Sequence, residues 1–189
     1  IPEGSLGADV RVLNLEPYIG ASFARNAGAM KAKGDFLTFL DDDDLWDINF
    51  TFYLAKKLQE ENADYVVGDI YKFTDLKPTP KLVHSVSSSK KPLKKSVLGD
   101  NPGFGGGNFI IRKKVFEKIG GFDTSVKWSE DQALAADLIF QNFTIIHEPQ
   151  AKYLERGHNG PRVRNNVQNN LQFYRKCRRY MSLSQRVWY

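Results

Sequence analysis

Cysteine is nearly absent from this chain, and long apolar runs are absent altogether. The single cysteine, Cys177, cannot form an internal disulfide, and we expect an unreactive thiol in a reducing compartment. No apolar run in the 189 residues is long enough to cross a bilayer, and no basic segment leads into an apolar secretion signal. The sequence therefore excludes a disulfide scaffold and an integral membrane segment, and it favours a cytoplasmic location, with the inner membrane face as an alternative.

The composition is that of a globular protein, because 41% of the residues are hydrophobic and 26% are charged. A chain of this length buries enough surface for one domain, which excludes a largely disordered protein. The net charge of +5 comes from two basic clusters, one within residues 90–95 and one within residues 162–186. Such clusters suit nucleotide phosphates, an acidic membrane face or nucleic acid, although a solvated surface explains either cluster alone.

Short apolar segments alternate with segments of helical periodicity along the chain. We expect strands at residues 10–15, 35–40, 64–73, 109–111 and 144–147, and helices at 23–33, 47–61, 114–119, 130–141 and from 167 to about 181. Ser22 is the expected cap of the first helix, Gly34 its stop, and Ser129 with Gln132 an expected capping box. Residues 77–107 are expected to form a long functional loop. The alternation predicts an α/β fold with a mostly parallel sheet.

Four consecutive aspartates, residues 41–44, follow the apolar segment 35–40. Ligands of open α/β sheets bind beyond the carboxyl ends of strands, and a divalent cation would relieve the repulsion between these carboxylates. Mg²⁺ and Mn²⁺ take such oxygen ligands and leave positions open for phosphates. The alternative is an acidic turn in which Asp44 and Asp47 cap the next helix.

Two other motifs compete for the same aspartates. A calcium loop of the EF-hand type fails, because its fifth and sixth positions would be Leu45 and Trp46. A haloacid-dehalogenase-like phosphohydrolase, with Asp41 as nucleophile and Asp43 as acid, remains an alternative although Leu45 departs from its usual pattern. A third hypothesis is a non-catalytic module that uses the basic C-terminal helix to bind nucleic acid or an anionic membrane.

Three further features fit an enzyme that handles phosphates. Arg25 lies in the first turns of the expected helix 23–33, where a helix N-terminus attracts anions. Glu130 and Asp131 begin another helix, either as stabilising charges or as a general base. The glycine-rich segment 103–107 precedes a strand, so it is no dinucleotide fingerprint and indicates only backbone that can approach a ligand.

Taken together, these segments resemble the glycosyltransferase family 2 enzymes of the GT-A fold, from about Val10 to His158. The resemblance is carried by Arg25-Asn26-Ala27-Gly28, by Leu40 with the four aspartates, by Gly106-Gly107-Asn108-Phe109 before Ile119-Gly120-Gly121-Phe122-Asp123, and by Glu130-Asp131 before Leu134. Each motif is weak alone, but their order and spacing are specific. The domains expected from it are a partial GT-A-like domain at residues 1–160 and a basic amphipathic helix and tail at 161–189.

The resemblance implies a role for each site residue. Asp41 and Asp43 would match the Asp-x-Asp motif that holds Mn²⁺ or Mg²⁺, with Asp43 as the direct ligand and Arg25, Asp41 and Asp42 near the nucleotide. Asp131 would be the base that activates an acceptor hydroxyl for inverting transfer, with Glu130 beside it. Gly107 and Asn108 would border the donor sugar and the acceptor, and His158 would approach the metal or the diphosphate.

The resemblance also implies partners and one departure. The donor would be a nucleotide-sugar, with a UDP-sugar as first choice, and the acceptor a hydroxyl group, in bacterial polysaccharide or glycoconjugate synthesis; no nucleic acid is expected. Family members begin with a strand, a Pro-x-Tyr-Asn-like turn, a helix and a second strand, and this chain starts after them. We therefore expect an N-terminal truncation, with exposed strand edges that promote self-association into a homo-oligomer.

Overall fold

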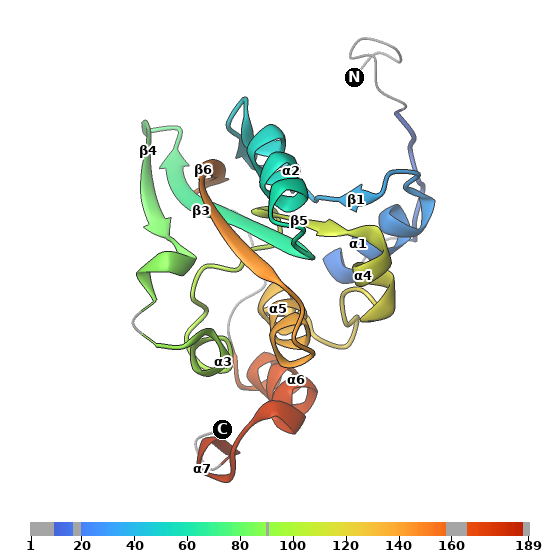
Figure 1. The fold of residues 1–189 in the computed structure, drawn as a ribbon, viewed down its shortest axis with the longest axis vertical. Coiled ribbons are helices and arrows are strands. Elements are labelled where there is room, and N and C mark those ends of the chain that lie inside the picture. The colour runs from blue at the N-terminus through green and yellow to red at the C-terminus, as the bar shows by residue number, and fades with distance from the viewer. Residues whose placement is uncertain (1–9, 17–19, 90, 158–165, 187–189) are drawn as a thin grey trace.

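The computed structural model describes residues 10–16, 20–89, 91–157 and 166–186. Its six-stranded sheet has the order β1-β5-β3-β6-β2, with β4 paired to β3 (Figure 1). The strands are β1 (Phe36–Leu37), β2 (Leu45–Trp46), β3 (Tyr65–Thr74), β4 (Lys77–His84), β5 (Phe109–Arg112) and β6 (Ile145–Arg156).

The sheet is mixed, whereas the sequence predicted a mostly parallel one. Only the central pair β3 and β6 runs parallel, and the other four pairings are antiparallel. One reason is local, because β3 passes into β4 through two residues, and so short a connection can join only antiparallel strands. The fold remains α/β, as predicted.

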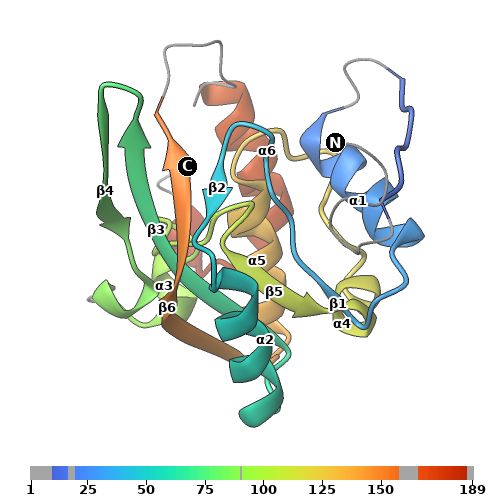
Figure 2. The ribbon, with the colours of Figure 1, turned by 90° about the horizontal axis from the view of Figure 1, so that it is seen from above.

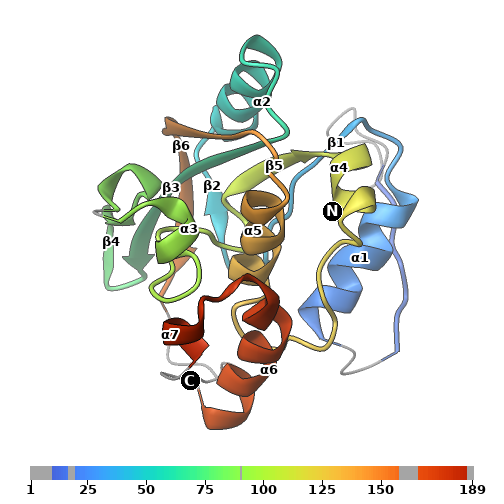
Figure 3. The same ribbon diagram turned by 60° about the horizontal axis from the view of Figure 1, so that its bottom comes forward.

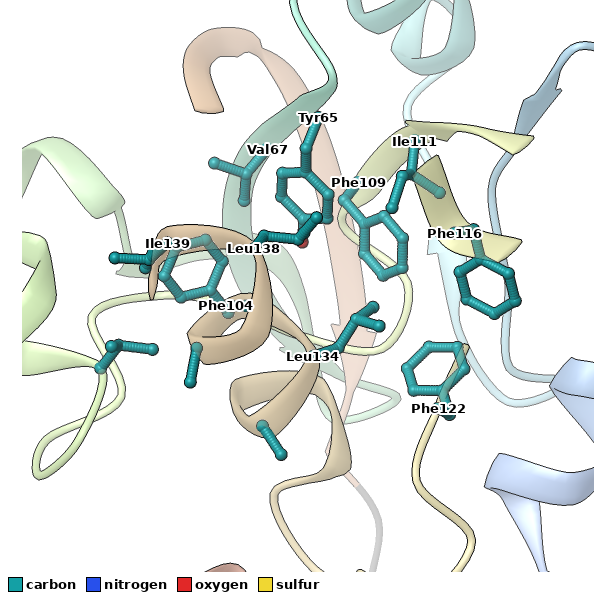
Figure 4. Packing of buried hydrophobic residues seen from close by; sticks show 14 of the residues in the cluster. Tyr65, Val67, Phe104, Phe109, Ile111, Phe116, Phe122, Leu134, Leu138 and Ile139 are labelled. Atoms are coloured by element: carbon teal, nitrogen blue, oxygen red, sulfur yellow. The ribbon is translucent and has the colours of Figure 1, made fainter. Parts of the chain in front are cut away.

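Alternating side chains on the strands supply two cores, one on each face of the sheet. Val66 and Ile110 face α2 (Phe50–Glu60), which inserts Phe50, Leu54 and Leu58. On the opposite face Tyr65, Val67, Phe109 and Ile111 share a core with α4 (Lys113–Lys118) and α5 (Glu130–Phe140), and α6 (Val167–Cys177) packs on α5 (Figures 3 and 4). The period of two in these strands thus places helices on both faces.

The N-terminal part differs from the prediction. Residues 10–16 form no strand, and Val12 is exposed, because no sheet neighbour in the described chain pairs with them. Helix α1 (Ala21–Lys31) begins after Gly20, whose φ of 87° suits glycine, so Ser22 lies buried inside the helix instead of capping it. Of the expected strand 35–40 only β1 is formed, paired antiparallel to β5 at the edge of the sheet (Figure 2).

The expected loop 77–107 contains more structure than predicted. It holds β4, the 3-10 turn η1 (Val86–Ser88) and the short helix α3 (Leu93–Ser96). The predicted capping box is also wrong. Ser129 has a left-handed φ of 61° and caps nothing with its side chain, while the Gln132 amide donates to the carbonyls of Val97 and Gly99. The hydrogen bonds of Gln132 to the segment after α3 replace the local bonds that a capping box would need.

The basic C-terminal segment consists of α6, η2 (Arg178–Tyr180) and α7 (Leu183–Arg186), and it packs onto α5 through α6 and through Tyr180, whose ring stacks on Phe140. Its buried side chains are Asn169, Phe173, Cys177 and Met181. The amphipathic pattern of this segment predicts an apolar face that includes Val167, and this is wrong, because Val167 is 77% exposed.

Two of its cations, Lys176 and Arg179, pair with the buried carboxylate of Asp137 at 2.8 and 2.7 Å. Burial raises the pKa of the Cys177 thiol to about 12, as expected of an unreactive cysteine. None of the helices in the described ranges is long and apolar enough to span a membrane.

Candidate active site

A cavity of about 680 Å³ lies where α1, the aspartate segment, the glycine-rich segment and the start of α5 meet. It is lined by Arg25, Asp41, Asp43, Asp44, Gly105, Gly106, Trp128, Glu130, Asp131, Tyr153 and Glu155, among others. Segments that are 90 residues apart in the sequence thus contribute carboxylates to one cavity. The predicted base and the predicted metal ligands share this cavity, as the sequence-based hypothesis requires.

Arg25 joins the two acidic segments of the cavity. Its guanidinium donates to Asp41 Oδ1 at 2.6 Å and to Glu130 Oε1 at 2.8 Å, and it lies over the Phe122 ring. The Arg25 side chain is only 11% exposed and that of Glu130 18%, so this pair is little screened by water, whereas the Asp41 side chain is 42% exposed. One buried cation therefore offsets charge from both segments and sets the distance between them.

Asn26, next to Arg25, binds the backbone of the segment that leads into α5. Its side-chain amide donates to the Phe122 carbonyl at 2.8 Å and accepts from the Phe122 backbone N–H at 2.9 Å. The segment that leads into α5 is thereby attached to α1. The sequence analysis included Asn26 in a motif but gave it no role.

The aspartate segment is held from behind by β6. Asp44 is buried, where its carboxylate accepts from the Tyr153 hydroxyl and from the Arg156 backbone N–H. The Arg156 guanidinium donates to the Asp43 carbonyl at 3.1 Å. Burial raises the pKa of Asp44, although both of its hydrogen bonds oppose that shift. The alternative role of Asp44 as a helix cap is wrong, since Asn49 precedes α2.

The glycine-rich segment passes close to two of these side chains. A Cβ on Gly106 would lie 2.6 Å from Arg25 Nη2, and one on Gly107 would lie 2.4 Å from the Tyr153 ring. Trp46 Nε1 donates to the Gly107 carbonyl at 2.9 Å. Glycine is thus needed because the backbone approaches the site and its support, which is the modest role the sequence indicated.

Asn108 anchors the glycine-rich segment from within. It is fully buried, donates to the carbonyls of Gly68 and Gly103, and accepts from the Gly105 N–H. Its side chain therefore serves the fold of the segment, while Gly105 and Gly106 line the cavity.

Asp131 lies in the first turn of α5 and lines the cavity, and one carboxylate oxygen accepts from the Gln132 N–H at 2.7 Å. Burial, and then the neighbouring Glu130 carboxylate, raise the pKa of Asp131 to about 7. A carboxylate with such a pKa is suited to accept a proton near neutral pH.

The carboxylates around the cavity fit a divalent cation that is shared with a bound phosphate. In the described part of the chain no three His, Cys, Asp or Glu side chains gather into a complete metal site. Asp41 and Asp43, however, line the cavity together. One or two carboxylates completed by substrate phosphates are the usual ligands of Mg²⁺ in nucleotide sites.

The structure brings most of the predicted site residues together. Arg25, Asp41, Asp43, Glu130 and Asp131 line the cavity, Gly107 lies behind it against Tyr153, and Asp42 is exposed outside it. His158 lies outside the described residues. Sequence reasoning missed Tyr153, Trp46 and Arg156, because nothing in a single sequence marks a residue whose role is to hold another.

Comparison with known proteins agrees with this geometry. The model of the family "Glycosyl transferase family 2" matches residues 5–120. An uncharacterized glycosyltransferase of Haemophilus influenzae is 30% identical over 169 residues, which cover 79% of this chain and 52% of the relative. The glycosyltransferase GlyG of Streptococcus pneumoniae is 39% identical over 66 residues, 35% of this chain and 22% of the relative.

Solved structures share the fold. TarS 1-349 of S. aureus in complex with UDP-GlcNAc superposes with a TM-score of 0.62 at 18% identity, over 85% of this chain and 46% of that one. GalNAc-T7 with UDP, GalNAc and Mn²⁺ gives 0.61 at 17% identity, over 84% and 34%. The chain spans about half or less of the length of each of these relatives. The fold is the GT-A fold of glycosyltransferases, and the chain belongs to glycosyl transferase family 2.

Proposed function

We propose that the cavity binds a nucleotide-sugar and transfers its sugar to an acceptor hydroxyl with inversion at the anomeric carbon. The observation that supports this most is the Arg25 bridge, because it joins the predicted metal ligands to the helix that carries the predicted base. Family membership supports a nucleotide-sugar donor, and the UDP complexes among the structural neighbours favour UDP as the nucleotide.

In this proposal each acidic segment has its own task. Asp41 and Asp43 would hold a Mn²⁺ or Mg²⁺ ion, which supplies charge neutralisation for the departing diphosphate. Arg25 contributes a fixed positive charge near the same end of the cavity. It also pairs with Glu130 and so holds the start of α5, which carries Asp131, against the aspartate segment.

Asp131 acts as the general base. It takes the proton of the acceptor hydroxyl while that oxygen forms a bond to the anomeric carbon, and the bond from this carbon to the diphosphate breaks with its electron pair leaving on the nucleoside diphosphate. With a pKa of about 7, a substantial fraction of Asp131 is ionised at neutral pH and available for this step.

Titration calorimetry with UDP, with and without Mn²⁺, tests the proposal on this chain. We expect UDP binding that needs Mn²⁺, is lost in Asp43→Ala and persists in Asp131→Asn. Transfer by the full-length protein should fall by about 10²–10⁴-fold in Asp131→Asn. Metal-independent UDP binding that Asp43→Ala leaves unchanged would contradict the assignment. The polysaccharide pathway, the cytoplasmic location and self-association remain predictions.

A further inference from the structure

The wall of the cavity beside Asp131 carries an aromatic side chain with no assigned role. Residues 124 and 126–131 all line the cavity, and Trp128 lies three residues before Asp131. The left-handed turn at Ser129 separates Trp128 from the helix. Because the acceptor must reach Asp131, this wall is the surface that an acceptor touches.

Trp128 differs from the other cavity-lining aromatic residues in lacking partners. Tyr153 donates to Asp44, and Phe104 packs on Tyr65. In the described ranges Trp128 has neither a hydrogen bond nor a ring contact, yet it is only partly exposed. A large aromatic side chain that lines a polar cavity and is only partly buried gains free energy when a ligand covers it.

Three polar side chains that line the same cavity as Trp128 are also unengaged. Thr124, Lys127 and His84 line the same cavity, and no side-chain hydrogen bond or ion pair of theirs occurs in the described part of the protein. A pyranose ring presents an apolar C–H face and a rim of hydroxyls. A cavity that offers an aromatic side chain together with unengaged donors and acceptors matches both features.

We propose that Trp128 is the platform on which the ring of a carbohydrate acceptor stacks, so that the acceptor of this enzyme is itself a sugar. This inference rests on the proposed function, because it takes Asp131 as the base. It goes further in naming the acceptor class and the residue that selects it. An acceptor without a sugar ring, such as a simple polyol phosphate, would leave the Trp128 plane uncovered.

Binding of small probes to the 189-residue chain tests this inference. The probes are the methyl β-glycosides of glucose, galactose and N-acetylglucosamine, with glycerol 3-phosphate as the polyol phosphate, each measured by NMR titration in the presence of UDP and Mn²⁺. We expect at least one glycoside to bind more tightly than glycerol 3-phosphate. Trp128→Ala should weaken that binding by about tenfold. Trp128→Phe, which keeps an aromatic plane, should retain most of it.

Phe52→Ala is the matched control, because Phe52 is 60% exposed on α2, outside the cavity. It should leave glycoside binding unchanged. The inference is overturned if no glycoside binds, if only glycerol 3-phosphate binds, or if Trp128→Ala binds the glycoside as well as the wild type does. UDP affinity, measured separately by calorimetry, distinguishes the two hypotheses. Intact UDP binding without glycoside binding removes the acceptor assignment alone, whereas failure of Mn²⁺-dependent UDP binding removes the proposed function.

Discussion

Two acidic segments, residues 41–44 and the pair Glu130 and Asp131, contribute carboxylates to one cavity but are built in different ways. The first is a non-helical segment whose last residue, Asp44, is anchored to β6 through Tyr153 and Arg156. The second is the first turn of a helix, where backbone N–H groups and the helix dipole favour negative charge. The first gains its order from distant residues and the second largely from its own helix.

This difference shows how aspartate side chains in one cavity acquire different pKa values and different roles. Asp44 is a structural anchor because both of its oxygens are engaged, and Asp131 has a pKa of about 7 because it is buried beside another carboxylate. Asp41 is held by Arg25. Residue type alone predicts none of these differences, since each follows from burial and from the nearest partner.

The largest effect should come from breaking the link between the segments. Arg25→Ala removes the cation shared by Asp41 and Glu130, and we expect it to lower the free energy of unfolding by about 3 kcal/mol, because two partly buried carboxylates lose their partner. Urea unfolding measures this change. Arg25→Lys, which keeps the charge but not the fork of donors, should lose less. A loss below about 1 kcal/mol would indicate that the bridge is only a surface pair.

A matched pair of aspartates tests the anchoring of the first segment. Asp44→Ala leaves the Tyr153 hydroxyl and the Arg156 N–H without their acceptor, which should cost about 2 kcal/mol. Asp42→Ala changes an exposed residue and should stay within about 0.5 kcal/mol of the wild type. If the two substitutions changed the stability equally in thermal unfolding, the anchoring role of Asp44 would be contradicted.

Two glycines test the support behind the first segment. Gly107→Ala brings a methyl group against the Tyr153 ring, which Asp44 holds in place, and should destabilise the protein by about 1.5 kcal/mol. Gly28→Ala, inside α1 with open space around its Cα, should instead be neutral or stabilising by up to about 1 kcal/mol. Chemical denaturation measures the free energy of unfolding of both variants. If both substitutions lowered it equally, the close approach of Gly107 to Tyr153 would not explain the effect.

The second segment should show its raised pKa in the pH dependence of stability. Between pH 4 and 7 the folded protein keeps a proton on Asp131 that the unfolded chain, with a pKa of about 3.9, has released. The contribution of Asp131 to the free energy of unfolding therefore falls as the pH rises through this range. Asp131→Asn removes the titration, so its stability relative to the wild type should rise by up to about 3 kcal/mol from pH 4 to 7. A difference that is independent of pH in urea titrations would contradict the raised pKa.

The sequence by itself determined the helices and strands whose patterns are long and regular. Helix α2, with Leu54 and Leu58, begins and ends within three residues of its predicted bounds. Strand β3, with Val66 and Val67, lies within one residue of its predicted bounds. The motif residues were also found, because the order of Arg25, the aspartates and Asp131 along the chain is specific enough to identify the family. Local periodicity and motif spacing are properties of sequence, so sequence reveals them.

Only the tertiary structure decided the directions of the strands, the absence of a strand at residues 10–16, and the different roles of the acidic side chains. Strand direction depends on which neighbour is available, and the predicted strand 10–15 has none in the described chain. The anchor made by Asp44 and Tyr153 joins residues 109 positions apart. Burial and contacts between residues so far apart arise only on folding, and they fix the pKa and the partner of each carboxylate.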